Sequence, residues 1–256
     1  MKDRPAATTS NSQPEIKPQF NNRPEKTIEE LTSTVVEDLQ APLRSLNRFT
    51  ELLAREYQDE LDEKGRLYLD RISASGSQMQ TLVEDLLTYS QTGTGEQTWI
   101  TVDLNQILSQ LQSELQSEIA NANATIAVGE LPQLLLNPKE IHQLFKEFLT
   151  NAIKFGGEKP QIEVSAVERD EEWLFAIADN GIGIAPEFHT QVFEVFQKLH
   201  SPDLYPGNGI GLAICYKIIK RYGGKIWIES KLGQGTKFYF TVPTDLSPLS
   251  LDAKII

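Results

Sequence analysis

Three short segments in the second half of the chain combine residue types that suit a phosphorylated nucleotide. They are Asn151-Ala-Ile-Lys-Phe155, Asp179-Asn-Gly-Ile-Gly183 and the run G-N-G-I-G-L-A from Gly207 to Ala213. Glycine lets backbone amides approach phosphate oxygens, and a helix that begins near Gly209 would add the positive end of its dipole. Each segment alone is weak evidence, because D-N-G is also a common turn sequence.

Polar side chains in and near these segments have the types that Mg-ATP requires. A buried Asp179 can accept a hydrogen bond from the adenine amino group. Asn151 offers a neutral oxygen to magnesium, a hard cation that prefers oxygen ligands. Lys154 and Lys198 can neutralise phosphate charge in a chain whose net charge is -12. Each of these residue types has a purpose if the ligand is ATP with Mg²⁺, in which case Asn151 would be the metal ligand.

The elements that must position these residues change in kind near Trp99. From there strands alternate with helices, which favours an α/β sandwich in which helices cover a sheet. The sequence predicts helices at about 101–120, 138–155 and 209–222, and strands at about 125–128, 161–167, 173–178, 225–229 and 236–242.

Two long amphipathic helices are predicted ahead of this domain. Thr27-Ile-Glu-Glu30 is a capping-box pattern, and apolar residues then recur at steps of three and four as far as Tyr57. A turn at 59–65 leads into a second helix from about Glu63 to Ser90. Such a hairpin has little partner surface of its own, so we expect dimerisation into a four-helix bundle. Packing of the hairpin onto the chain's own C-terminal domain is the alternative.

Composition argues against several other classes of protein. The net charge of -12 argues against nucleic acid or an anionic membrane as a general partner. No apolar run reaches about 18 residues, so no membrane span is expected. The single cysteine, Cys215, fits a reducing cytoplasm, and its expected place is a buried helix position. Residues 1–25 are rich in Pro, Ser, Thr and Asn and are expected to be disordered.

Together and in this order, the three segments resemble the N box and glycine boxes of the sensor histidine kinases, and Val192 to Lys198 resembles their phenylalanine box. The resemblance covers about Glu25 to Pro243, and it points to the phytochrome-like, cyanobacterial branch. It implies an α+β protein whose ATP domain has the fold shared with gyrases and heat-shock chaperones. The expected parts are a disordered segment at 1–25, a dimerising and phosphoacceptor-like hairpin at 26–93, an ATP-binding domain at 98–245 and a tail at 246–256.

By this resemblance, Asn151 binds magnesium, Asp179 contacts adenine, and residues 197–208 form a mobile lid. The expected nucleotide-binding residues are Asn151, Lys154, Asp179, Gly181, Gly183, Lys198, Gly207, Gly209, Gly211, Leu212 and Thr236.

One departure from the family pattern lies in the stretch S-T-V-V-E-D-L-Q-A-P-L-R, which resembles the phosphoacceptor box. Asp38 and Pro42 are retained, but Glu37 stands where the family has its acceptor histidine. Position 37 is two residues from both Val35 and Leu39, so at about 100° per residue it should point away from the apolar stripe. The sequence therefore predicts a pseudokinase that holds ATP but has no histidine to phosphorylate.

Glu147 is a second departure, because histidine kinases typically carry asparagine four residues before the magnesium ligand. In chaperones, mismatch-repair ATPases and related serine kinases, a glutamate at this offset is the general base. Residues 147 and 151 share one helix face, so the carboxylate could reach the nucleotide. The alternative is a harmless substitution on a solvated edge.

Three functions remain open from the sequence. The first is a cytoplasmic ATP-binding signalling protein that acts by pairing with an intact histidine kinase or by a nucleotide-dependent change of shape. Its expected partners are a second copy of the chain, such a kinase, or a response regulator. The second is an ATPase or serine/threonine kinase that uses Glu147. The third is a kinase that phosphorylates the histidine of a partner subunit.

Overall fold

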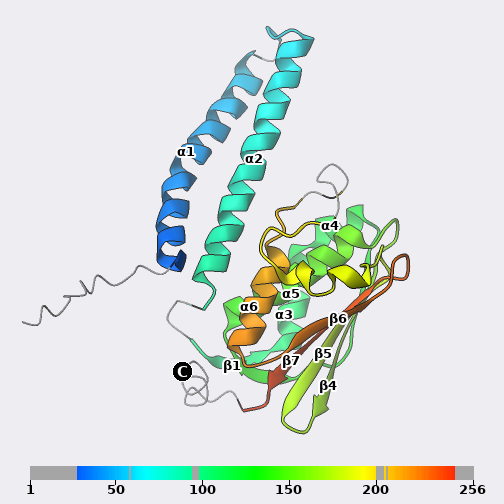
Figure 1. The fold of residues 1–256 in the computed structure, drawn as a ribbon. Coiled ribbons are helices and arrows are strands. Elements are labelled where there is room, and N and C mark those ends of the chain that lie inside the picture. Colours follow the sequence, from blue (N-terminus) through cyan, green and yellow to red (C-terminus); the bar gives the residue numbers. More distant parts are fainter. Residues whose placement is uncertain (1–27, 58, 94–97, 200–204, 206, 246–256) are drawn as a thin grey trace, which may run out of the picture.

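The computed structural model describes residues 28–57, 59–93, 98–199, 205 and 207–245; within the first helix, it describes side chains only at Val36 and from Asp38 onward. A helical hairpin projects from an α/β domain, and both are visible in Figure 1. No helix in these ranges is both long and apolar enough to cross a membrane.

The hairpin consists of α1 (Ile28–Tyr57) and α2 (Glu63–Gln91). The side chain of Asp62 caps α2 by accepting a hydrogen bond of 2.7 Å from the amide of Gly65. The amide of Asn47 donates to Gln80 at 2.7 Å and ties the two helices together. Both helices agree with the prediction, although the capping box at Thr27 lies outside the described residues.

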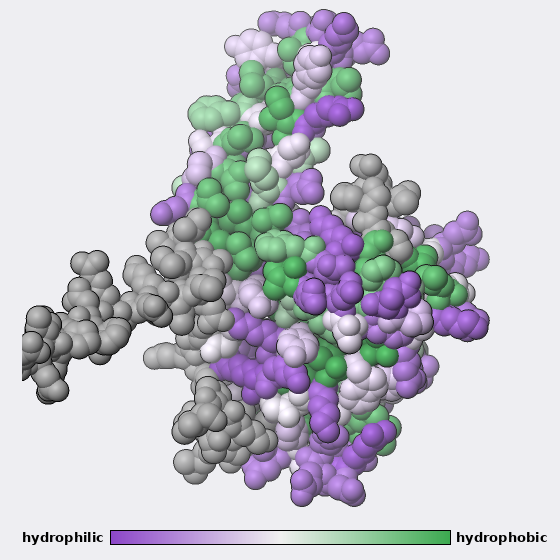
Figure 2. Space-filling model, viewed as in Figure 1, coloured by the Kyte–Doolittle hydropathy of each residue, from purple (hydrophilic) through white to green (hydrophobic). Residues whose placement is uncertain are grey.

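Apolar side chains of α1 remain exposed in the single chain. Val36 and Thr50 are buried, whereas the exposed members of the predicted stripe, at 40–62% exposure, are Leu39, Leu46, Phe49, Leu53 and Tyr57. Figure 2 shows apolar surface along the hairpin. These residues therefore do not pack onto the chain's own C-terminal domain, and the alternative prediction is wrong for them.

The C-terminal domain is built on a five-stranded sheet with the order β2-β4-β5-β7-β6. All neighbouring strands are antiparallel except β2 and β4, which are parallel. The strands are β2 (Thr125–Val128), β4 (Gln161–Arg169), β5 (Glu172–Asp179), β6 (Ile226–Ser230) and β7 (Thr236–Pro243). Helices α3 (Leu104–Glu114), α5 (Pro138–Phe155) and α6 (Gly211–Arg221) cover one face (Figure 1), so the expected α/β sandwich is confirmed.

Aromatic side chains join α5 to the sheet. The rings of Phe175 and Phe240 stack at 4.8 Å between centroids, and Phe148 stacks on Phe240 at 5.8 Å. All three are at most 1% exposed, and burial of such a side chain contributes about 1.5–3 kcal/mol. Asn137 caps α5 by accepting from the amide of Lys139 at 3.0 Å. This packing holds α5 in place on the sheet, and the opposite edge of α5 lines the candidate functional site.

The start of the α/β domain differs from the prediction. Residues expected to open a helix at 101 form strand β1 (Ile100–Asp103), which pairs with β3 (Gln133–Leu136) in a second, two-stranded sheet. Asp103 then caps α3, and the predicted helix is interrupted at Leu115 before α4 (Gln116–Asn121). A strand of four residues is too short to show a periodicity, and its partner is about 30 residues away, so neither strand was predicted.

Candidate functional site

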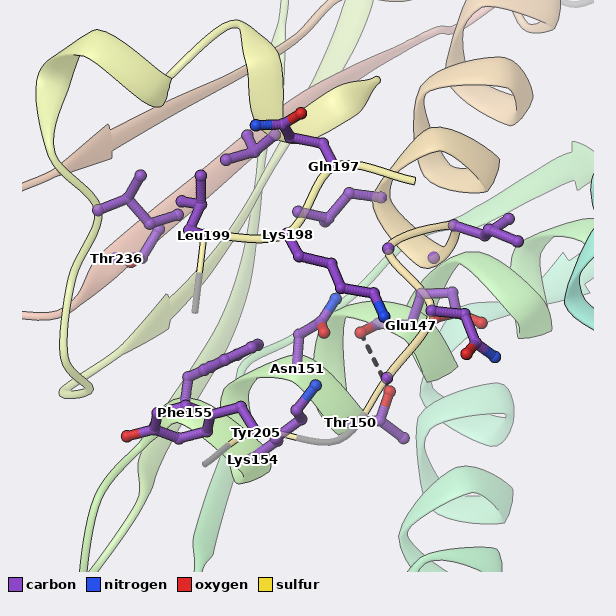
Figure 3. A pocket seen from close by; sticks show the side chains of 18 of the residues that line it. Glu147, Thr150, Asn151, Lys154, Phe155, Gln197, Lys198, Leu199, Tyr205 and Thr236 are labelled. Carbon is purple, nitrogen blue, oxygen red and sulfur yellow. Dashed lines mark hydrogen bonds between the residues drawn. The ribbon is translucent and has the colours of Figure 1, made fainter. Parts of the chain in front are cut away.

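A cavity of about 340 Å³ lies between α5, the loop after β5 and the segment that leads into α6. Figure 3 shows Glu147, Asn151 and Lys154 of α5 on one side of it, and Lys198 on another. The predicted site residues that line this cavity are Glu147, Asn151, Lys154, Asp179, Gly183, Lys198, Gly207, Gly209, Gly211, Leu212 and Thr236. The fold therefore brings the three sequence segments to one place.

Asp179 ends β5, next to Thr236 on the neighbouring strand β7. Its Oδ1 accepts hydrogen bonds from the amides of Gly181 at 2.8 Å and Thr236 at 3.1 Å. Burial raises the pKa of the Asp179 carboxyl, and these two hydrogen bonds oppose the rise. The carboxylate is thus held in one orientation at the cavity wall, where its other oxygen can accept from a ligand.

Gly181 does not itself line the cavity, so its predicted role needs correction. A Cβ at this position would collide with the carbonyl oxygen of Phe155. The glycine instead allows the backbone to turn close to α5 and to present its amide to Asp179. Its role in this fold is to orient the carboxylate.

The glycine segment before α6 surrounds one end of the cavity. Gly209 has a φ of +71°, a conformation that favours glycine, and a Cβ there would meet the backbone of Gln197. No side chain caps α6, so its first amides are left for another acceptor. Glycine at 211 also makes room for the carboxylate of Glu147, with which a Cβ would collide. Backbone amides and a helix start of this kind suit an anion.

Two lysines add positive charge to the same cavity. Burial, together with the neighbouring ammonium of Lys198, lowers the pKa of Lys154. Two like charges brought together in this way are relieved by an anionic ligand between them. The Nζ of Lys154 also lies 4.6 Å from the ring centroid of Phe155, and this ring is 4.9 Å from that of Tyr205. The sequence analysis did not predict a ligand contact for either aromatic side chain, although both line the cavity.

Glu147 lies in the cavity wall and not on a solvated edge. Its Oε1 accepts a hydrogen bond of 2.6 Å from Gln143, one turn earlier on α5. Burial and the negative charge of Asp85 raise the pKa of Glu147 to about 7, although the hydrogen bond from Gln143 opposes the rise. A carboxyl group with a pKa near neutrality can exchange protons at physiological pH.

This pKa predicts a pH-dependent stability difference for Glu147→Gln. The pKa of Glu147 is higher in the folded state than its ordinary value of 4.5. The protonated carboxyl therefore contributes fully to the free energy of unfolding below pH 4.5, and this contribution is lost as the pH rises to about 7. One pKa unit corresponds to about 1.4 kcal/mol. The free energy of unfolding of the variant, relative to the wild type, should therefore increase by on the order of 3 kcal/mol above pH 7 and should not increase below pH 4.5.

Urea unfolding of both proteins between pH 4.5 and 8.5 measures this difference. Glu118→Gln, on the exposed side of α4, is the matched control and should show no such divergence because water already surrounds its side chain. A constant difference between wild type and Glu147→Gln across this range would contradict the prediction.

Asp38, a site residue predicted in the hairpin, lies away from this cavity. Asp38 is exposed on α1 and does not line the cavity; Glu37 belongs to α1, but its side chain lies outside the described part. The expected lid is described only at 197–199, 205 and 207–208. Among the described residues, no cluster of three or more His, Cys, Asp or Glu could hold a metal ion.

Asp85 is a further cavity residue that was not predicted from the sequence. It belongs to α2 of the hairpin, yet it lines the cavity and accepts a hydrogen bond of 3.0 Å from the side chain of Asn208. Nothing in the sequence around it, V-E-D-L-L, distinguishes it from an ordinary polar position on an amphipathic helix. Only the packing of the hairpin end against the α/β domain reveals it.

The hairpin and the α/β sandwich, with its glycine-lined cavity, define the two-domain core of a sensor kinase. Comparison with protein families gives the same assignment. Residues 27–95 match the His Kinase A (phospho-acceptor) domain, and residues 136–246 match the family described as histidine kinase-, DNA gyrase B-, and HSP90-like ATPase. The chain therefore belongs to the sensor histidine kinase family.

Two of the similar curated proteins are a phytochrome and a phytochrome-like protein. Cyanobacterial phytochrome A of Nostoc sp. is 41% identical over 207 residues, which are 80% of this chain and 27% of that protein. Phytochrome-like protein Cph1 of Synechocystis sp. is 38% identical over 207 residues, which are 80% of this chain and 28% of that protein. The chain thus spans roughly a quarter of the length of these relatives.

Solved structures show the same fold. Full-length ShkA in complex with AMPPNP has a TM-score of 0.68 and 27% identity, and the match covers 86% of this chain and 47% of that one. Histidine kinase ThkA in complex with the response regulator TrrA has a TM-score of 0.59, with 87% of this chain and 66% of that chain covered. Its 21% identity shows the fold alone.

Proposed function

We propose that this chain is a nucleotide-binding signalling module that does not phosphorylate itself on histidine. The observation that carries the proposal is Glu37, which stands in α1 at the acceptor position of a segment that otherwise keeps the family pattern. A carboxylate cannot form the phosphoramidate that imidazole forms, and an acyl phosphate hydrolyses readily in water. The described histidines, His142 and His189, belong to the α/β domain and not to the hairpin.

The proposed ligand is Mg-ATP. Asp179 would accept from the adenine amino group, and Asn151 would bind the metal together with phosphate oxygens and water. The lysines on two sides of the cavity and the glycines before α6 would hold the phosphates. The proposal is supported by the size of the cavity and by the convergence of these groups in it.

The proposed partner is a second copy of the chain or an intact histidine kinase. The exposed apolar stripe of α1 supports this, because a four-helix bundle would remove it from water. A response regulator is a further candidate partner, since the similar fold of ThkA was solved in complex with one. The proposed location of this activity is the cytoplasm, which the single cysteine of the sequence, Cys215, fits.

Glu147 favours a second candidate, an ATPase or serine/threonine kinase. Its carboxylate lines the cavity beside the first residue of α6, with a pKa of about 7. A general base works best when its pKa is near the working pH. A third candidate, phosphorylation of a partner's histidine, uses the same cavity and needs no acceptor in this chain.

The proposal predicts that the purified chain forms no phosphohistidine. Incubation with labelled ATP should give no acid-labile, base-stable phosphate on this chain, because the acceptor position carries Glu37. Replacing Glu37 with histidine should restore labelling, since Asp38 and Pro42 are already in place. The matched control is Asp38→His, which moves the imidazole to the neighbouring position and should stay unlabelled.

Adding a phytochrome-type histidine kinase core that keeps its acceptor histidine but is deficient at its ATP site separates the three candidates. Acid-labile phosphate on this added core, dependent on this chain, indicates phosphorylation in trans. Acid-stable phosphate, or steady phosphate release, indicates the second candidate. Phosphohistidine on the wild-type chain itself would overturn the leading proposal.

A further inference from the structure

The C-terminal end of α2 contacts the α/β domain at the nucleotide-type cavity. Asp85 contributes its carboxylate to the cavity lining, and Oδ2 accepts a 3.0 Å hydrogen bond from Nδ2 of Asn208. Asn208 is only 6% exposed and lies between two glycines that line the same cavity. A side chain of the hairpin is thus bonded to the segment expected to hold phosphates.

A second contact lies one turn further along α2. The Nζ of Lys217, on α6, donates to the carbonyl oxygen of Tyr89 at 3.0 Å and lies 4.8 Å from the centroid of its ring. Leu86 and Tyr89 also pack against the core of the α/β domain. We call Asp85, Leu86 and Tyr89 the α2 latch, because these residues hold the domain on the hairpin.

A bound anion at this end of the cavity would be repelled by the Asp85 carboxylate, and this repulsion would weaken the α2 latch. Asp85 is close enough to Glu147 for its negative charge to raise the pKa of that residue, so two carboxylates already face each other here. The same end carries the glycines and the start of α6, which suit phosphate oxygens. A triphosphate would repel the Asp85 carboxylate, and its oxygens would compete with that carboxylate for the Asn208 amide.

We propose that phosphate opens the α2 latch at Asp85. Binding of a nucleoside triphosphate breaks the Asp85–Asn208 hydrogen bond and releases the α/β domain from the end of α2. This inference rests on the proposed nucleotide-binding function. It couples the charge of the ligand to the position of the domain relative to the hairpin. The released domain is then free to contact a partner's hairpin, so the latch also regulates action in trans.

The competition predicts a gain in affinity when the Asp85 charge is removed. Asp85→Asn keeps the shape of the side chain and an oxygen that can accept from Asn208, but it removes the repulsion. The variant should bind Mg-AMPPNP about five- to tenfold more tightly than the wild type in calorimetry, whereas adenosine, which has no phosphate, should bind both equally. Glu84→Gln removes the same charge from the adjacent, exposed position and should leave both affinities unchanged.

Release is measured by hydrogen exchange of the backbone amides of residues 82–92. Saturating Mg-AMPPNP should raise their exchange in the wild type and in Glu84→Gln. The latch proposal would be wrong if wild type and Asp85→Asn bound Mg-AMPPNP equally, or if nucleotide left the exchange of residues 82–92 unchanged. Either result would still leave the proposed nucleotide site in place. If none of the proteins binds Mg-AMPPNP, the proposed function fails and the latch fails with it.

Discussion

Replacing Asp179 with asparagine should lower the affinity for adenine nucleotides by about 100-fold or more, without unfolding the domain. Oδ1 of Asp179 accepts from two backbone amides, of Gly181 and Thr236, and the asparagine oxygen can take over both bonds. The second oxygen is replaced by an amino group, which would point a donor at the amino group of adenine. Loss of a charge-assisted hydrogen bond, plus an unpaired donor, costs about 3 kcal/mol, which is about 100-fold in affinity.

Asparagine is a sharper test than alanine at this position. Alanine would leave the amides of Gly181 and Thr236 without their acceptor, so a loss of binding could follow from a change in the fold. Titration of a fluorescent ATP analogue against wild type and Asp179→Asn measures affinity, and urea unfolding checks that stability is retained. Glu172→Gln, at the opposite end of β5, is the control and should bind as the wild type does. Affinities within about threefold of each other would remove the assignment of Asp179 to adenine.

The second large effect is expected from Glu147→Gln, which should lower ATP turnover by about 10²- to 10⁴-fold if the residue is the general base. Glutamine keeps the size of the side chain and a hydrogen-bonding oxygen for Gln143, but it cannot accept a proton. Nucleotide affinity should not fall, because the change removes neither a positive charge nor a glycine from the cavity. Glu147→Asn, which recreates the usual family residue beside Asn151, should lower turnover as well.

The pH profile of the wild type separates catalysis from packing. A base must be ionised to accept a proton, so phosphate release should rise with pH through about 7, the pKa of Glu147, and this rise should vanish in Glu147→Gln. Phosphate release and ATP affinity are measured for all three proteins at matched magnesium, with Glu118→Gln as the control. If the wild type releases phosphate no faster than Glu147→Gln, the residue is no base and the chain is a nucleotide-responsive scaffold.

These experiments also distinguish the roles of the two carboxylates that meet in the cavity. Asp85→Asn should strengthen triphosphate binding because Asp85 competes with phosphate for Asn208. Glu147→Gln should change turnover because the carboxylate lies beside the start of α6, where the terminal phosphate is expected. Opposite outcomes, with tighter binding in Glu147→Gln and lost turnover in Asp85→Asn, would reverse this assignment.

Local pattern alone was enough for much of the fold. The start of α5 at Pro138 and its end at Phe155 were predicted as the structure has them, because amphipathic periodicity and helix caps are encoded in neighbouring residues. The five strands of the main sheet and the two long helices were predicted for the same reason, with ends displaced by one or two residues. Strands β1 and β3 were missed because short strands are defined by their distant partners and not by their own sequences.

For the site, residue types and their order predicted the chemistry, whereas the geometry depends on how separate elements pack together. Residue type and order were enough to select Asn151, Asp179 and the glycines before α6, and the replacement of the acceptor by Glu37 is visible only in the sequence. That Gly181 orients Asp179, that Glu147 is buried with a raised pKa, and that Asp85 of the hairpin enters the cavity depend on contacts between residues far apart in the chain. Burial and charge proximity arise only when separate elements pack together, so no local pattern can encode them.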